Sequence, residues 1–111
     1  MKTIFVVLLI LFGVNAFADT VVIGQKNKLF VVKDGSSDSA KSEISVKKGD
    51  TVRFINDDEF FHNVFSLSDA KLFDLGSFPK GEFRDVIFDT PGMVEVECAI
   101  HPEMKININV E

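Results

Sequence analysis

The sequence is poor in cysteine, proline, histidine and the larger aromatic residues. Its 111 residues contain one cysteine, three prolines, two histidines and no tryptophan or tyrosine. A single cysteine excludes an intramolecular disulfide, and aromatic packing is left to the twelve phenylalanines. The sequence also has no internal repeat and no long run with helical periodicity. A chain of this length and pattern predicts one domain built without helices.

Basic residues are also scarce relative to acidic ones. The chain has 12 Lys and Arg against 17 Asp and Glu, which gives a formal net charge of −5. Nucleic-acid binding depends on clustered Lys and Arg that neutralise phosphates. We therefore expect no nucleic-acid partner.

Residues 1–18 have the pattern of a secretory signal peptide. A positively charged start at Lys2 precedes the apolar run 4–14, and Ala16-Phe17-Ala18 is a small-x-small cleavage site. The run is too short to span a membrane, which takes about 20 apolar residues. We expect export by the general secretory route, with residues 19–111 as the mature domain and no membrane attachment after cleavage. The destination would be the periplasm, or the medium if the host has no outer membrane.

Short alternating runs with turn signals between them predict an all-β sandwich. The expected strands cover residues 20–23, 29–32, 42–46, 51–56, 60–65, 83–88, 93–98 and 104–110. Two of them, 42–46 and 51–56, are separated by a Lys-Lys-Gly-Asp turn and are predicted to form a hairpin.

Three polar or mixed segments are expected to lie outside the strands. Residues 34–39 are predicted to form a loop, and 66–75 are compatible with one helical turn around 69–71. The carboxylates of 57–59 are interpreted as a solvated loop.

The residues with metal-binding chemistry are concentrated near the C-terminus. Cys98, His101 and Met104 follow one another at every third position, and the other histidine, His62, lies 36 residues upstream of Cys98. Because side chains alternate across a strand, Cys98 and Met104 are expected to face the core at facing ends of neighbouring strands, with residues 99–103 connecting them. An unpaired thiol in an oxidising compartment is a liability unless it is buried, paired with another chain or bound to metal.

A thiolate, two imidazoles and a thioether form a soft donor set that selects copper. Each residue alone has a plainer explanation, as an inert buried thiol, a core histidine or a core methionine. Their joint occurrence in register favours a mononuclear copper site. A structural zinc site usually takes four Cys or His ligands, and only three such residues exist. A dinuclear copper centre would need two bridging cysteines, and a Cys–His nucleophile would need an accessible thiolate.

His62-Asn63-Val64 and the spacing Cys98-x-x-His101-x-x-Met104 resemble the small blue copper proteins, or cupredoxins, and among them the amicyanin and plastocyanin group. The resemblance extends over Lys48–Val52 and the Pro91-Gly92 turn. It implies a cupredoxin-like Greek-key β-sandwich of about seven or eight strands that binds one Cu(I)/Cu(II) ion.

The resemblance also assigns roles to single residues. It implies His62, Cys98 and His101 as equatorial copper ligands and Met104 as the axial ligand. Asn63 would hydrogen-bond across to the ligand loop. An apolar patch around His101 would serve as the electron port and docking surface, and its members here would be Phe61, Ile100 and Pro102. Glu103 departs from the apolar residue usual at that place.

The function predicted on this basis is that of a small exported type 1 copper protein. It would be a monomer, and it would not be an enzyme. It would shuttle single electrons between a donor and an acceptor redox protein through transient docking. A periplasmic copper carrier that binds and hands over the ion itself is the alternative, and the sequence leaves it open.

Overall fold

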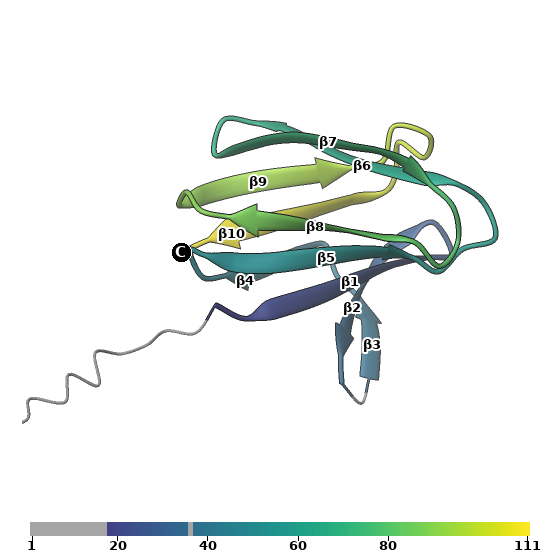
Figure 1. Ribbon diagram of the computed structural model, residues 1–111, viewed down its shortest axis with the longest axis horizontal. Coiled ribbons are helices and arrows are strands. Elements are labelled where there is room, and N and C mark those ends of the chain that lie inside the picture. Colours follow the sequence, from purple (N-terminus) through teal and green to yellow (C-terminus); the bar gives the residue numbers. More distant parts are fainter. Residues whose placement is uncertain (1–17, 36) are drawn as a thin grey trace, which may run out of the picture.

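Two five-stranded sheets form the two layers of a sandwich (Figure 1). The first sheet has the strand order β3-β2-β1-β5-β8, and the second has the order β4-β10-β9-β6-β7. The bounds are β1 Thr20–Lys26, β2 Leu29–Asp34, β3 Ser37–Ala40, β4 Glu43–Val46, β5 Asp50–Asn56, β6 His62–Ser68, β7 Lys71–Phe78, β8 Phe83–Phe88, β9 Gly92–Glu97 and β10 Lys105–Val110. The all-β prediction is confirmed, with ten strands instead of seven or eight.

This computed structural model describes residues 18–35 and 37–111. Residues 1–17, which make up nearly all of the predicted signal peptide, lie outside the described part. Within the described ranges, no helix is long and apolar enough to cross a membrane.

The chain changes sheets more often than the sequence suggests. β4 pairs in parallel with β10 in one sheet, whereas β5 pairs in parallel with β1 and antiparallel with β8 in the other. The predicted hairpin of 42–46 with 51–56 is therefore wrong. Alternation shows which face of a strand is buried, but it does not show in which sheet the strand lies. Here both strands bury one face, and they do so from opposite layers of the sandwich. The turn between them, with Gly49 at φ 96°, carries the chain across the sandwich instead of folding it back.

The predicted loop at 34–39 is also wrong, because part of it is strand. Asp34 pairs with Ser37 and Val31 with Ala40, so β2 and β3 form a hairpin that projects from the body of the sandwich (Figure 1). All four residues of β3 are exposed. A strand with two solvated faces has no apolar alternation to reveal it.

The helical turn expected around 69–71 is replaced by a second hairpin. β6 continues to Ser68 and β7 begins at Lys71. Leu67 and Leu72 pair across the two strands, and both are exposed on the outer face. These outward leucines hide the alternation that would otherwise have predicted two strands.

Inward side chains from both sheets fill one core. On β5 every second residue is buried, and the same holds for β9 and β10. Phe54 lies edge-on to Phe30 with ring centroids 6.3 Å apart, and it also packs on Phe73, which meets Phe88. Full burial of such a side chain stabilises the fold by about 1.5–3 kcal/mol. Phenylalanine therefore links the two sheets in a chain that lacks tryptophan and tyrosine.

Candidate metal centre

His62 opens β6 at the end of the sandwich where the β9–β10 loop lies (Figure 1). Its side chain is fully buried. The pairing of β6 with β7 shifts register between Asn63 and Phe65, which marks a β-bulge just after the histidine. Bulges of this kind re-aim side chains next to functional sites.

The loop between β9 and β10 supplies the other donors. Cys98 and Met104 flank it, and each is 1% exposed, so the predicted inward orientation of both is confirmed. The loop is closed by backbone hydrogen bonds, in which the N–H of Met104 donates to the carbonyl of His101 at 2.9 Å and the N–H of Cys98 donates to the carbonyl of Met104 at 3.3 Å. These hydrogen bonds within the loop help to set the positions of a thiol, an imidazole and a thioether.

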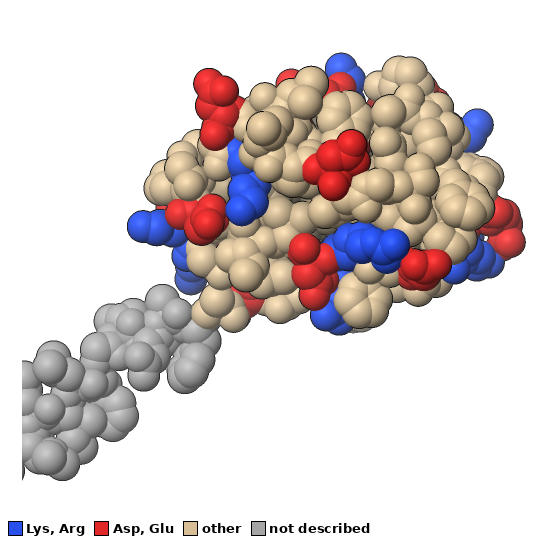
Figure 2. Space-filling model, turned by 45° about the horizontal axis from the view of Figure 1, so that its top comes forward, with Lys and Arg blue, Asp and Glu red and all other residues tan. Residues whose placement is uncertain are grey.

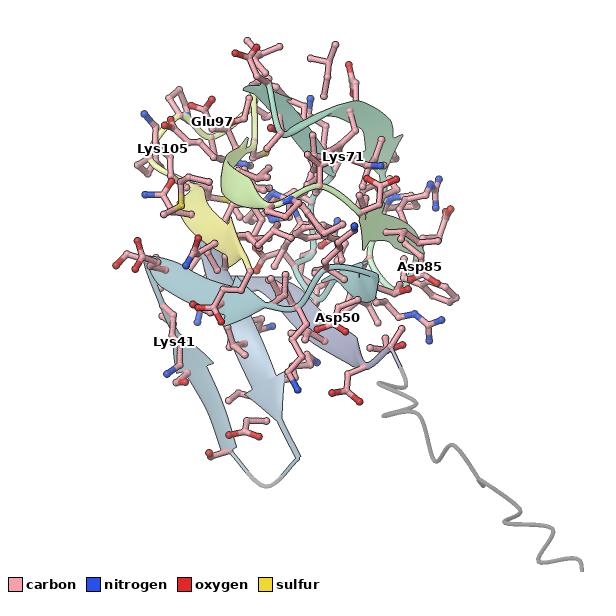
Figure 3. All side chains as sticks on the ribbon, turned by 90° about the vertical axis from the view of Figure 1, so that its left-hand side faces the viewer. Lys41, Asp50, Lys71, Asp85, Glu97 and Lys105 are labelled. Atoms are coloured by element: carbon pink, nitrogen blue, oxygen red, sulfur yellow. The ribbon has the colours of Figure 1, made fainter. Side chains whose placement is uncertain are left out.

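The two strands that carry this loop are held in register outside the core. Glu97 and Lys105 face each other on β9 and β10, and their charged groups approach to 3.5 Å (Figure 3). Lys105 is exposed and Glu97 is partly exposed, so the pair contributes at most about 1 kcal/mol. Its place beside Cys98 and Met104 ties both ends of the loop to one register.

The donor atoms of His62, Cys98 and His101 form a small triangle. The two Nδ1 atoms are 3.2 Å apart, and Cys98 Sγ lies 3.6 Å from His62 Nδ1 and 3.7 Å from His101 Nδ1. The point equidistant from the three atoms is about 2 Å from each, within the range of metal–nitrogen and metal–thiolate bonds for a first-row ion such as zinc. The residues present therefore fit a bound metal ion without rearrangement.

Asn63 joins the two parts of the centre. Its side-chain Oδ1 accepts a hydrogen bond of 2.7 Å from the backbone N–H of Ala99. The bond connects the residue after His62 with the residue after Cys98. It therefore fixes the ligand loop against β6.

Asp58 is a member of the centre that sequence reasoning missed. The prediction of a solvated loop at 57–59 is wrong for this residue, which is 4% exposed. Its Oδ2 lies 2.6 Å from Nε2 of His62. The burial of every second residue in β5, from Asp50 to Asn56, continues for one more step to Asp58, but this continuation is visible only in the structure.

The two neighbours of Asp58 form ion pairs with lysines at the surface. Asp57 forms an ion pair with Lys33 at 2.6 Å, and Glu59 pairs with Lys80. The three consecutive carboxylates therefore have three different environments, and the middle one alone contacts His62.

The environment of Asp58 favours its ionised form. Burial raises the pKa of this carboxyl, but hydrogen bonds from His62 and from the backbone N–H groups of Asn27 and Lys28 together hold the pKa below its usual value. An ionised carboxylate can only accept hydrogen bonds. Nε2 of His62 is then the donor of this hydrogen bond, and Nδ1 is the ring nitrogen that faces Cys98 and His101.

His101 connects the centre to the surface. It is half-buried, whereas Phe61 is 55% and Ile100 51% exposed, and Pro102 is also exposed. The three residues of the predicted patch are therefore at the surface, where Ile100 and Pro102 lie in the loop and Phe61 directly precedes His62. Phe60 was not predicted, yet its ring centroid lies 5.1 Å from that of His62 and 5.2 Å from that of His101. Glu103 is exposed as well.

Comparisons with known proteins place the chain in a family. The model for copper-binding proteins of the plastocyanin/azurin family matches residues 27–111. The chain belongs to this family and is a type 1 blue copper protein, a cupredoxin. A search of curated protein sequences finds no match.

Solved structures share the fold. Amicyanin from Paracoccus versutus (Thiobacillus versutus) is similar with 24% identity and a TM-score of 0.67, over 86% of this chain and 83% of that one. An amicyanin variant in the Cu(I) state matches with 22% identity and a TM-score of 0.69, over 83% and 82%. A copper-containing nitrite reductase from Thermus scotoductus matches with 23% identity and a TM-score of 0.69. The match covers 83% of this chain but only 22% of that longer one.

Copper is accordingly the metal of this protein, and the donor set suits it. Thiolate and imidazole donors lie close together among buried residues, with a buried thioether beside them. A soft set of this kind is typical of electron-transfer copper sites.

Proposed function

We propose that this protein is an exported blue copper electron carrier, in which His62, Cys98, His101 and Met104 would hold the copper ion. The observation that carries the proposal is the triangle of two Nδ1 atoms and one Sγ with sides of 3.2, 3.6 and 3.7 Å. When bound, copper supplies a one-electron Cu(I)/Cu(II) couple. The carrier takes one electron from a donor protein and passes it to an acceptor protein, so no bond in the chain is made or broken.

The protein's own part is to hold the donors in place and keep water away. His62 opens β6 and Cys98 directly follows the neighbouring strand β9, and the Asn63–Ala99 hydrogen bond holds the loop. Both residues are essentially buried. Donors that do not move between oxidation states keep the reorganisation small, which favours fast electron transfer over catalysis of a bond-making reaction.

Adding Cu(II) to the purified protein tests this function. We expect one equivalent to produce an intense visible thiolate-to-copper band that ascorbate removes and reoxidation restores. A colourless complex that prefers Cu(I) and gives up its ion readily to a chelator would instead favour the copper-carrier alternative. The absence of stoichiometric binding would contradict both functions.

We also propose export, with residues 1–18 removed and 19–111 as the working domain. The backbone nitrogen of Asp19 donates to the buried carboxylate of Asp50 at 2.9 Å, and its carbonyl accepts from Thr51 at 2.9 Å. Cleavage after Ala18 would therefore place the new α-ammonium group against a buried carboxylate, which favours this position as the mature N-terminus.

Mass spectrometry of the protein recovered from the periplasm of an expressing bacterium checks this boundary. The expected chain begins at Asp19 and is 18 residues shorter than the full sequence. Recovery of the full-length chain from the cytoplasm alone would contradict export.

The partners we propose are redox proteins that dock transiently on the apolar patch of Phe61, Ile100 and Pro102 around His101. Elsewhere on the surface, acidic and basic side chains are interspersed on the face shown in Figure 2. The patch consists of exposed apolar side chains next to His101, a proposed ligand of the metal. A partner docked there would therefore have a short path for an electron through His101. We propose that the carrier works as a monomer.

A further inference from the structure

Asp58 forms a buried bridge between the metal centre and the β1–β2 turn. Its Oδ2 contacts Nε2 of His62 at 2.6 Å and accepts from the backbone N–H of Lys28 at 3.2 Å, and its Oδ1 accepts from the backbone N–H of Asn27 at 2.7 Å. Every contact of this carboxylate therefore comes from a donor. Its charge is held in one place by groups on two different segments.

The turn that holds Asp58 is itself well defined. Asn27 and Lys28 are the two residues between the paired ends of β1 and β2, and both have positive φ, at 53° and 57°. This is the backbone of a two-residue type I′ hairpin turn, which points consecutive N–H groups to one side. The ammonium group of Lys28 lies 5.7 Å from the centroid of Phe60, the ring that packs on both histidines. The turn is thus connected to the centre by two independent contacts.

We propose that Asp58 is a positioning residue that lowers the reduction potential of the copper site, by fixing the tautomer of His62 and by placing a buried negative charge behind this ligand. The inference rests on the proposed copper function and adds a residue that controls it.

The direction follows from charge. Oxidised copper carries one more positive charge than reduced copper, so a fixed negative charge stabilises the oxidised state more. A carboxylate that accepts the distal N–H of a ligating imidazole also makes the imidazole a stronger electron donor. Because Asp58 is buried, water and salt screen its charge less than they screen the charge of a surface residue. Removing the charge should therefore raise the potential.

The chain offers matched controls on either side of Asp58. Asp58→Asn removes one charge and keeps an oxygen that can accept from His62. Asp57→Asn and Glu59→Gln remove the same formal charge one residue away, from side chains that are partly exposed (Asp57) or exposed (Glu59) and paired with lysines. We expect Asp58→Asn to shift the Cu(II)-to-Cu(I) affinity ratio at least tenfold toward Cu(I), which is about 59 mV for one electron. Both controls should shift it much less, and Asp58→Glu should return the potential toward that of the unchanged protein.

A second measurement needs no substitution. In the metal-free and Cu(I) forms, both of which are diamagnetic, NMR should show a downfield Nε2–H proton of His62 that exchanges slowly with water. A rapidly exchanging or absent Nε2–H signal would overturn the geometry even if Asp58→Asn failed to fold.

The outcomes separate this inference from the proposed function. A chain without a reversible copper couple would overturn the proposed function, whatever Asp58 does. An intact blue couple with equal potential shifts for Asp58→Asn, Asp57→Asn and Glu59→Gln would overturn the positioning role alone, because only a general charge effect would remain.

Discussion

Replacing Cys98 with serine is expected to abolish the intense visible absorption of the copper-loaded protein. The band arises from charge transfer between the thiolate and Cu(II), and Cys98 is the single cysteine of the chain. Serine has nearly the same shape, so the buried position next to β9 remains filled, but a hydroxyl is a hard and weakly acidic donor that suits copper poorly. The absorption spectrum after addition of one equivalent of Cu(II) checks this expectation.

The neighbouring substitution Ala99→Ser serves as the control. It introduces the same hydroxyl one residue away, at an exposed position, and leaves the thiolate and the backbone hydrogen bond to Asn63 in place. Circular dichroism should show the same sheet content for both variants. An intense band in the Cys98→Ser protein would show that the thiolate is not its source and would refute Cys98 as a ligand.

The local pattern of the sequence was sufficient to place Cys98 and Met104. Both lie at the ends of strands whose apolar residues alternate without interruption, so a period of two residues predicted their orientation. The register of β9 with β10, which brings the two ends together, follows from the short loop between them. Neighbouring residues alone were therefore sufficient to predict that both side chains face the core.

The arrangement of the strands in two sheets could not be derived in the same way. β4 and β5 are adjacent in sequence and both bury one face, yet they lie in different layers. Their partners, β10 and β1, are far away along the chain, and a parallel pairing leaves no turn signal between the partners. The hairpin was predicted from the residues of the turn between the two strands. The sheet to which each strand belongs is instead determined by its pairing with a distant strand.

Asp58 shows the same limit for polar residues. Three carboxylates in a row are typical of a solvated loop, and two of them, Asp57 and Glu59, do pair with surface lysines. Burial of the middle one becomes favourable only because the β1–β2 turn, about 30 residues earlier in the chain, offers it backbone N–H donors. Only the folded chain brings that turn and the ligand histidine to the same carboxylate.

The second large effect is expected when a charge is placed in the docking patch. Ile100 is 51% exposed on the loop that contains His101. Association of two protein surfaces depends on a few central apolar residues from which water is expelled, and a lysine there would have to lose its hydration. We expect Ile100→Lys to slow electron self-exchange between Cu(I) and Cu(II) molecules by about tenfold, the equivalent of 1.4 kcal/mol in the encounter. NMR line broadening in mixtures of the two oxidation states measures this rate.

Ile87 provides a matched control for the position of the charge. It is the same residue type with nearly the same exposure, 55%, but it lies on β8 in the other sheet. Ile87→Lys therefore adds the same charge and removes the same apolar side chain away from the ligand loop. Its self-exchange rate should stay close to that of the unchanged protein.

The sign of the net charge makes the comparison decisive. The chain is acidic, with a formal charge of −5, so either lysine weakens the repulsion between two identical molecules. Long-range electrostatics alone would make both variants exchange electrons faster. A slower rate for Ile100→Lys alone can then come only from local contact at the patch around His101. Equal rates for the two variants would instead show that electrons leave the protein by another surface.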